Sequence, residues 1–137
     1  FTVNIALIED HQPVTGVVHV PVTDTSYFGA QGVGAWRQQG GKDAAAIRVR
    51  KPAADPAVIV GSRSHANPEL ATQLGKLGPH ELISMGSSLK FCLIAEGLAD
   101  IYPRCAPTLE WDTAAGQAIV EACGGLVVRQ DIGEKLL

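Results

Sequence analysis

The chain has 137 residues, a formal net charge of −3, 46% hydrophobic residues and few aromatic residues. This length suffices for one folded unit with a modest core, and the composition is typical of globular proteins. The acidic balance excludes a broad basic surface for duplex nucleic acid, and no apolar run approaches the ~20 residues that a membrane-spanning helix needs.

The first part of the chain alternates short apolar segments with turns. Within residues 1–9, Val3, Ile5 and Leu7 alternate with polar or small residues, which is the period of a half-buried strand. Further short strands are predicted at 14–20, 27–31 and 47–49. Because tight turns join them, residues 1–50 are predicted to form an antiparallel meander, the sheet part of a first domain.

Beyond the prolines of 51–56, strands and helices alternate. Strands are predicted at 57–61, 82–85, 100–102 and 126–129, and helices from Asn67-Pro68, from Ser87 or Ser88, and over 113–123. The order β-α-β-α-β-α-β predicts an α/β domain over residues 51–137. The expected fold class is therefore mixed α/β, with antiparallel strands followed by this layered region.

Three polar segments lie where a predicted strand ends and a helix begins, which is where ligands collect in α/β units. In the segment Gly86 to Lys90, glycine allows close approach of the backbone, and the helix start that includes Ser87 favours an anion. Lys90 lies in the first turn, where a cation is unfavourable for the helix, and a bound phosphate would explain it. The alternative is a serine-capped helix with a surface lysine.

The other two segments are less specific. Ser64 and His65 could contact a phosphate, or they could belong to a polar loop without a ligand. Asp112 could bind a metal ion at a helix start, or it could be an N-cap worth ~1 kcal/mol. One aspartate cannot form a magnesium site, because Mg²⁺ prefers near-octahedral oxygen coordination.

The three cysteines are widely spaced and form no Cys-x-x-Cys pair. A zinc site or a disulfide framework is therefore not expected. Cys92 and Cys123 lie on apolar helical faces, where a free thiol acts as a small hydrophobe. A reducing, cytoplasmic location is expected.

The segment Trp111-Asp112-Thr113-Ala114-Ala115-Gly116, followed by Gly124-Gly125, resembles the C-terminal motif of the inositol monophosphatase superfamily. Residues 1–9, 62–65 and 86–93 are similar to those of the CysQ-type 3′(2′),5′-bisphosphate nucleotidases within it. The resemblance covers nearly the whole chain. It implies an inositol-monophosphatase-like fold and a phosphatase that converts 3′-phosphoadenosine 5′-phosphate to AMP.

The resemblance further implies Mg²⁺ as cofactor, inhibition by lithium, Asp112 as a metal ligand, and His65, Gly86 and Lys90 as contacts of the nucleotide. The family's other metal ligands belong to an Asp-Pro-hydrophobic-Asp-Gly-Thr segment that would precede Phe1, so the chain is expected to be a fragment that hydrolyses little by itself. A sheet edge left open in such a fragment would favour self-association as a homodimer.

Arg104 bears on the substrate. It occupies roughly the place where inositol monophosphatases carry an acidic residue, and a cation suits a second phosphate better than a sugar hydroxyl. A bisphosphorylated nucleotide is therefore preferred as the substrate. The alternatives are another phosphatase of the superfamily, acting on inositol phosphate or a sugar phosphate, and a non-catalytic nucleotide-binding module.

Overall fold

The computed structural model describes residues 1–61, 68–76, 78–104, 107–129 and 133. Its larger layer is a five-stranded antiparallel sheet in the order β1-β2-β3-β4-β5. The strands are β1 (Val3–Glu9), β2 (Gln12–Val20), β3 (Thr25–Ala30), β4 (Gly34–Gln39) and β5 (Ala45–Ile47), with a short 3-10 turn at Pro21–Thr23. The predicted meander is confirmed, with strand ends that differ by a few residues.

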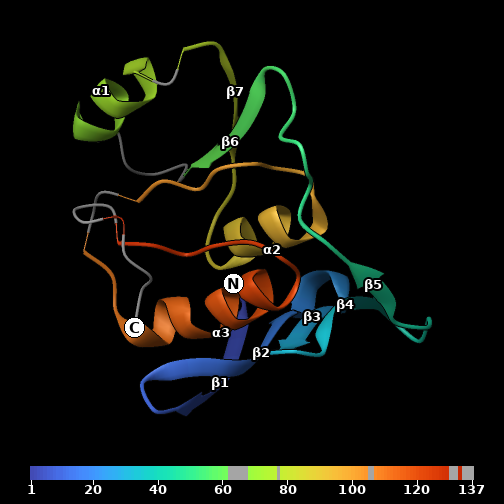
Figure 1. Ribbon diagram of the computed structural model, residues 1–137. Helices are drawn as coiled ribbons and strands as arrows, with labels where there is room; N and C mark the ends of the chain where they lie inside the picture. The colour runs from blue at the N-terminus through green and yellow to red at the C-terminus, as the bar shows by residue number, and fades with distance from the viewer. Residues whose placement is uncertain (62–67, 77, 105–106, 130–132, 134–137) are drawn as a thin grey trace.

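Alternation of side chains along the strands decides which face of this sheet is buried. On β2, Gly16, Val18 and Val20 are buried, while Val17 and His19 on the other face are only half-buried. Helix α3 (Glu110–Ala122) packs on the buried face, where Val18, Ile119 and Val120 form part of the main core. Figure 1 shows α3 between the sheet and α2. Residues from both halves of the chain thus share one core.

Gly16 sets how closely α3 approaches the sheet. A Cβ atom added to Gly16 would meet the backbone of Ala115, which belongs to α3 and cannot move like a flexible side chain. Glycine at this position therefore permits a helix-to-sheet distance that any larger residue would increase.

The second part of the chain forms a smaller, parallel arrangement. Strand β6 (Ala57–Gly61) pairs in parallel with β7 (His80–Ser84), and α1 (Pro68–Lys76) lies between them in the sequence. Helix α2 (Leu89–Glu96) follows and ends at Gly97, whose φ of 78° is left-handed. The strand at 57–61, helix starts at Pro68 and after Ser88, and the mixed α/β class are confirmed.

Two of the predicted strands do not form. Residues 100–102 make only a single bridge, between Ile101 and Ile59, because Pro103 has no N–H to extend the ladder. Residues 126–129 also form no extended strand among the described elements, and Val128 alone makes a single bridge. Within its described residues, the layered region therefore contains two paired strands where the sequence pattern predicted four.

An ion pair connects residues 48–54 to the small sheet. Arg50 donates to both carboxylate oxygens of Asp100, at 3.1 and 2.7 Å, and the backbone N–H groups of Val58 and Ala54 donate to the same carboxylate. Arg50 and these N–H groups hold the pKa of Asp100 below its usual value, although burial opposes them. Asp100 thereby fixes the start of the segment that leads to Tyr102 and Arg104.

Candidate functional site

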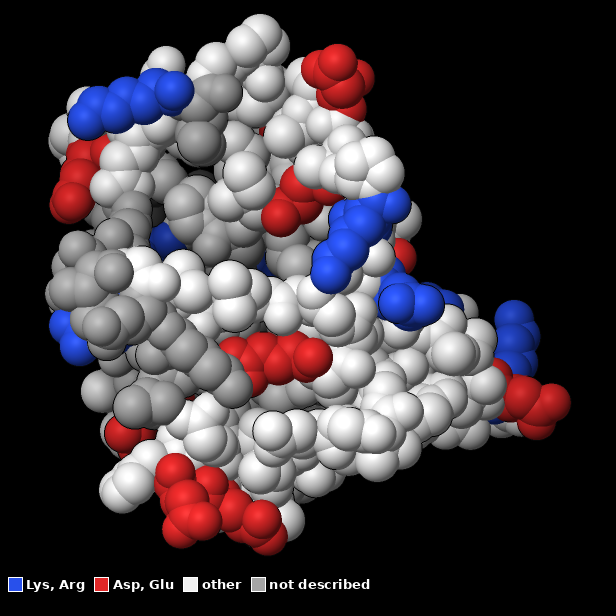
Figure 2. Space-filling view, in the orientation of Figure 1, with Lys and Arg blue, Asp and Glu red and all other residues white. Residues whose placement is uncertain are grey.

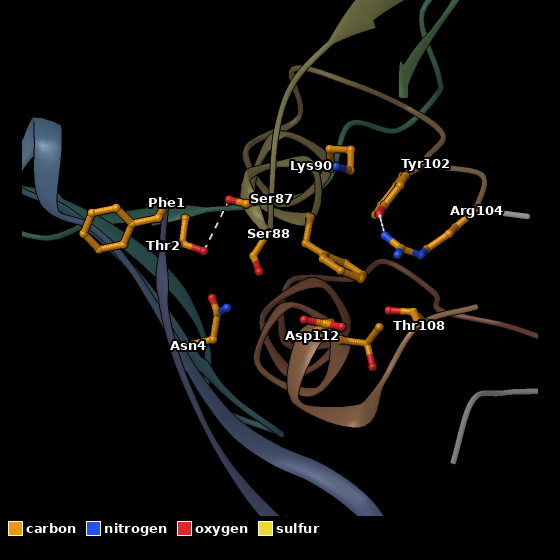
Figure 3. Close-up of a pocket in the computed structure, with 12 residues that line it drawn as sticks. Phe1, Thr2, Asn4, Ser87, Ser88, Lys90, Tyr102, Arg104, Thr108 and Asp112 are labelled. Carbon is orange, nitrogen blue, oxygen red and sulfur yellow. Dashed lines mark hydrogen bonds between the residues drawn. The ribbon is translucent and has the colours of Figure 1, made fainter. Parts of the chain in front are cut away.

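A pocket of about 320 Å³ opens where the start of β1, the N-terminal ends of α2 and α3, and the residues Tyr102, Arg104 and Thr108 meet. Four predicted site residues line it together: Ser87, Lys90, Arg104 and Asp112 (Figure 3). Gly86 precedes Ser87 without lining the pocket. Ser64 and His65 lie outside the described residues. The fold therefore brings together four residues that the sequence analysis selected from distant segments.

The cationic side of the pocket consists of Lys90 and Arg104. Lys90 is only 4% exposed, so the alternative of a surface lysine is wrong. Its ammonium group donates to the carbonyl oxygen of Met85 at 3.3 Å and lies 5.4 Å from the centroid of the Tyr102 ring. Burial lowers the pKa of Lys90, and the positive charge of Arg104 lowers it further. An anion in the pocket would relieve both costs.

Asp112 forms the acidic side of the pocket, on the first turn of α3. The helix begins at Glu110, three residues earlier than predicted, with Leu109 as the N-cap. The Leu109 N–H donates to Oδ2 of Asp112 at 3.4 Å, which is one half of a capping box, since the leucine side chain has no acceptor for the other half. The expectation that Asp112 is itself the N-cap is therefore wrong: it lies at the third helical position, where its carboxylate caps the turn from within.

The backbone at the start of α2 has a conformation that suits anion binding. Ser87 has a φ of 49°, a left-handed conformation that is uncommon outside glycine. Ser88, the N-cap, is buried and makes no side-chain cap hydrogen bond. The unpaired N–H groups of a helix start and its dipole both favour an anion at this place.

Several lining residues were not identified from the sequence. Thr2, just before β1, and Asn4, on β1, point towards the pocket, and the hydroxyl of Thr2 lies 3.4 Å from that of Ser87. The amide oxygen of Asn4 is buried and has no hydrogen-bond partner among the residues that the structure describes. The alternation along β1 contained the signal, because the polar residues at even positions share the face opposite to Val3.

The described residues do not form a complete metal centre. Asp112 is the only carboxylate that lines the pocket, and the described ranges hold no group of three or more His, Cys, Asp or Glu side chains that could bind a metal ion. Asp112 can supply one oxygen ligand of the several that Mg²⁺ requires. The chemistry that these residues support directly is the binding of phosphate groups.

Charged side chains of both signs are mixed on the face of the molecule that Figure 2 draws. Figure 2 shows basic side chains in separate small groups, with acidic side chains between them. That face offers no broad basic surface for a nucleic acid. Among the described helices, none is long and apolar enough to cross a membrane.

Comparison with known proteins gives consistent results. The profile of the inositol monophosphatase family matches residues 1–137. The chain is 53% identical over 127 residues to the 3′(2′),5′-bisphosphate nucleotidase CysQ of Salmonella typhimurium, which covers 93% of this chain and 50% of that protein. The chain thus spans about half the length of the curated relatives it matches.

Solved structures show the same fold. The crystal structure of CysQ from Bacteroides thetaiotaomicron, described as a bacterial member of the inositol monophosphatase family, has a TM-score of 0.81 and 45% identity over 90% of this chain and 52% of that one. Mycobacterium tuberculosis SuhB has a TM-score of 0.77 and 25% identity, covering 96% and 55%.

Proposed function

Because the chain belongs to the inositol monophosphatase family, we propose that it forms the phosphate-binding part of a 3′(2′),5′-bisphosphate nucleotidase. The reaction is hydrolysis of the 3′-phosphate of 3′-phosphoadenosine 5′-phosphate, in which water is consumed and AMP and phosphate are released. The observation that carries the proposal is the presence of two cations, Lys90 and Arg104, in the pocket that also contains Asp112. The activity for which the CysQ relatives are named supports it.

Charge and burial suggest how the pocket would bind such a substrate. Lys90 is a buried point charge, suited to a phosphate that enters fully, whereas the exposed Arg104 can pair with a second phosphate through its planar fork. The start of α2, at Ser87 and Ser88, adds backbone donors. A sugar monophosphate would leave one of the two cations without a partner.

We include Mg²⁺ in the proposal, with Asp112 as one of its ligands. The other ligands would come from residues other than those that line the pocket. When bound, such an ion would neutralise charge on the phosphate and lower the pKa of a water molecule. Lithium is expected to inhibit. The roles of Ser64, His65 and Gly86 as substrate contacts remain part of the same proposal.

The test is phosphate release by the full-length polypeptide that contains this chain. We expect Mg²⁺-dependent release from 3′-phosphoadenosine 5′-phosphate, with a higher kcat/KM than for inositol 1-phosphate, and reduced release when lithium is added. Preference for inositol 1-phosphate would contradict the proposed substrate. Tight binding of the nucleotide without Mg²⁺ and without release would indicate a non-catalytic module. The 137-residue chain alone is the matched control, and we expect little release from it.

Location and assembly complete the proposal. Cys92 and Cys123 are buried free thiols, which supports a reducing, cytoplasmic compartment. Strand β1 is the edge of the sheet within the described residues, and Ile5 and Leu7 are exposed on it. An exposed apolar edge favours strand pairing between copies, so we expect a homodimer, which sedimentation of the chain at several concentrations would detect.

A further inference from the structure

Tyr102 connects the two cations of the pocket, although no sequence pattern singled it out. The Lys90 ammonium group lies 5.4 Å from the centroid of its ring, and the Arg104 guanidinium group donates to its hydroxyl oxygen at 3.3 Å. Figure 3 shows Tyr102 between these two side chains. One residue therefore contacts each cation through a different chemical group.

The tyrosine offsets a repulsion that the pocket would otherwise contain. Lys90 and Arg104 line the same pocket, and the charge of Arg104 disfavours the charged form of Lys90. The negative face of an aromatic ring attracts an ammonium group, while a phenol oxygen accepts a hydrogen bond from a guanidinium group. Tyr102 thus provides a partner for each cation.

The ring of Tyr102 is itself held in place. Its edge packs against Phe91, with ring centroids 5.1 Å apart and planes at 79°. Phe91 in turn fills the space beside Gly116 on α3, where an added Cβ atom would collide with the phenyl ring. Arg104 has a second anchor, a hydrogen bond at 3.4 Å to the carbonyl oxygen of Pro107. The contacts of Tyr102 with Phe91, and of Phe91 with α3, therefore fix the guanidinium group relative to the helix that carries Asp112.

We propose that Tyr102 is a positioning residue that sets the separation of Lys90 and Arg104, so that the pocket selects substrates with two phosphate groups over those with one. This inference rests on the proposed nucleotidase function and adds the residue that determines its selectivity. Tyr102 acts through Arg104: its hydroxyl orients the guanidinium group, and the guanidinium group binds the phosphate that does not react.

The experiment compares kcat and KM for 3′-phosphoadenosine 5′-phosphate and for adenosine 3′-monophosphate in the full-length polypeptide. The variants are Tyr102→Phe, which removes only the hydroxyl, Arg104→Lys, which keeps the charge and loses the fork, and the double variant. For Tyr102→Phe we expect KM for the bisphosphate to rise about tenfold with little change in kcat. The preference for the bisphosphate over the monophosphate should fall by about the same factor.

The double variant separates positioning from a general structural role. If Tyr102 acts through Arg104, the double variant should lose no more preference than Arg104→Lys alone. Equal losses for both substrates, or additive losses in the double variant, would overturn the inference while leaving the nucleotidase proposal intact. A wild-type protein with equal kcat/KM for the two substrates would overturn both. Because Arg104 is exposed, Arg104→Lys is expected to fold even if Tyr102→Phe does not, and an unchanged substrate preference in Arg104→Lys would also overturn the inference.

Discussion

Helices α2 and α3 both present their N-terminal ends to the pocket, but their first turns carry opposite charge. Glu110 and Asp112 lie in the first turn of α3, and α2 has no acidic residue there but carries Lys90. Acidic residues stabilise a helix start, whereas a cation at the same place destabilises it. One helix start thus follows the ordinary preference and the other violates it.

This difference determines what each residue says about function. The hydrogen bond from the Leu109 N–H and the position in the first helical turn account for Asp112 through local helix energetics alone, so its presence is weak evidence for a metal ligand. Lys90 is unfavourable for its helix and is also buried, with its pKa lowered. Such an arrangement is typical of a site that binds an anion, because residues that cost stability persist where a ligand uses them.

The largest expected effect separates the two explanations of Asp112. Asp112→Asn keeps an oxygen that can accept from the Leu109 N–H, but it removes the negative charge. If Asp112 binds the metal, phosphate release by the full-length polypeptide should fall at least about 100-fold, more than the loss of an outer-shell partner. The free energy of unfolding should fall by only about 0.5 kcal/mol, the contribution of a charge near a helix end.

Glu110→Gln is the matched control, because Glu110 lies in the same first turn and does not line the phosphate pocket. Its phosphate release should stay close to that of the wild type. Equal effects of the two variants would show that Asp112 acts only as a helix cap, and the proposed metal site would then be lost.

The close packing of α3 gives the second largest effect. Gly16→Ala places a methyl group against the backbone of Ala115, so the helix must move away from the sheet. We expect the free energy of unfolding to fall by about 2–3 kcal/mol, as in other overpacked cores. Urea unfolding of the chain measures this loss. Gly41→Ala is the control, since nothing lies within 4 Å of its added Cβ atom. If Gly16→Ala left the free energy of unfolding unchanged, that result would contradict the observed close approach of α3 to the sheet.

The sequence predicted those parts of the fold that depend on local patterns. The alternation in residues 1–9 identified β1, and the serines at 87–88 marked the start of α2. The start of α3 was missed because Leu109 is an apolar N-cap, which no capping preference anticipates. The segment 126–129 has the composition of a strand, but strand formation also needs a partner, which a single segment cannot reveal.

The candidate site, like the fold, was predictable where it depends on local sequence patterns. Ser87, Lys90, Arg104 and Asp112 were identified because each lies where ligands collect or has an unusual charge. Tyr102 was missed, because its role depends on contacts with side chains from two separate segments. The burial of Lys90 was also unexpected, since it depends on the carbonyl group of Met85 and on that same ring.

A third prediction concerns the start of α2, where the cation Lys90 stands in place of the acidic residue that a helix start prefers. Lys90→Met keeps the length and apolar stem of the side chain but removes its charge. We expect KM for 3′-phosphoadenosine 5′-phosphate to rise about tenfold or more, the loss of a charged hydrogen bond. The free energy of unfolding should not decrease, because a buried cation is replaced by an apolar group. Lys42→Met, at an exposed turn, is the control for both measurements.

A simultaneous loss of stability would change the interpretation of Lys90. In that case the ammonium group would be needed as the hydrogen-bond donor to the Met85 carbonyl oxygen. The positive charge in the first turn of α2 would then have a structural cause and would not indicate a bound anion. An unchanged KM would exclude Lys90 from phosphate binding altogether.

The smallest effect is a shift in pH dependence that follows from the lowered pKa of Lys90. Burial and Arg104 favour the neutral amine in the free protein, whereas a bound phosphate favours the ammonium form. Binding therefore takes up a proton once the pH exceeds the pKa of the free site. KM for the bisphosphate should rise with pH in a range below the ordinary pKa of lysine, about 10.4. The Lys90→Met variant should show no such rise, and a rise that persists in it would assign the titration to another group.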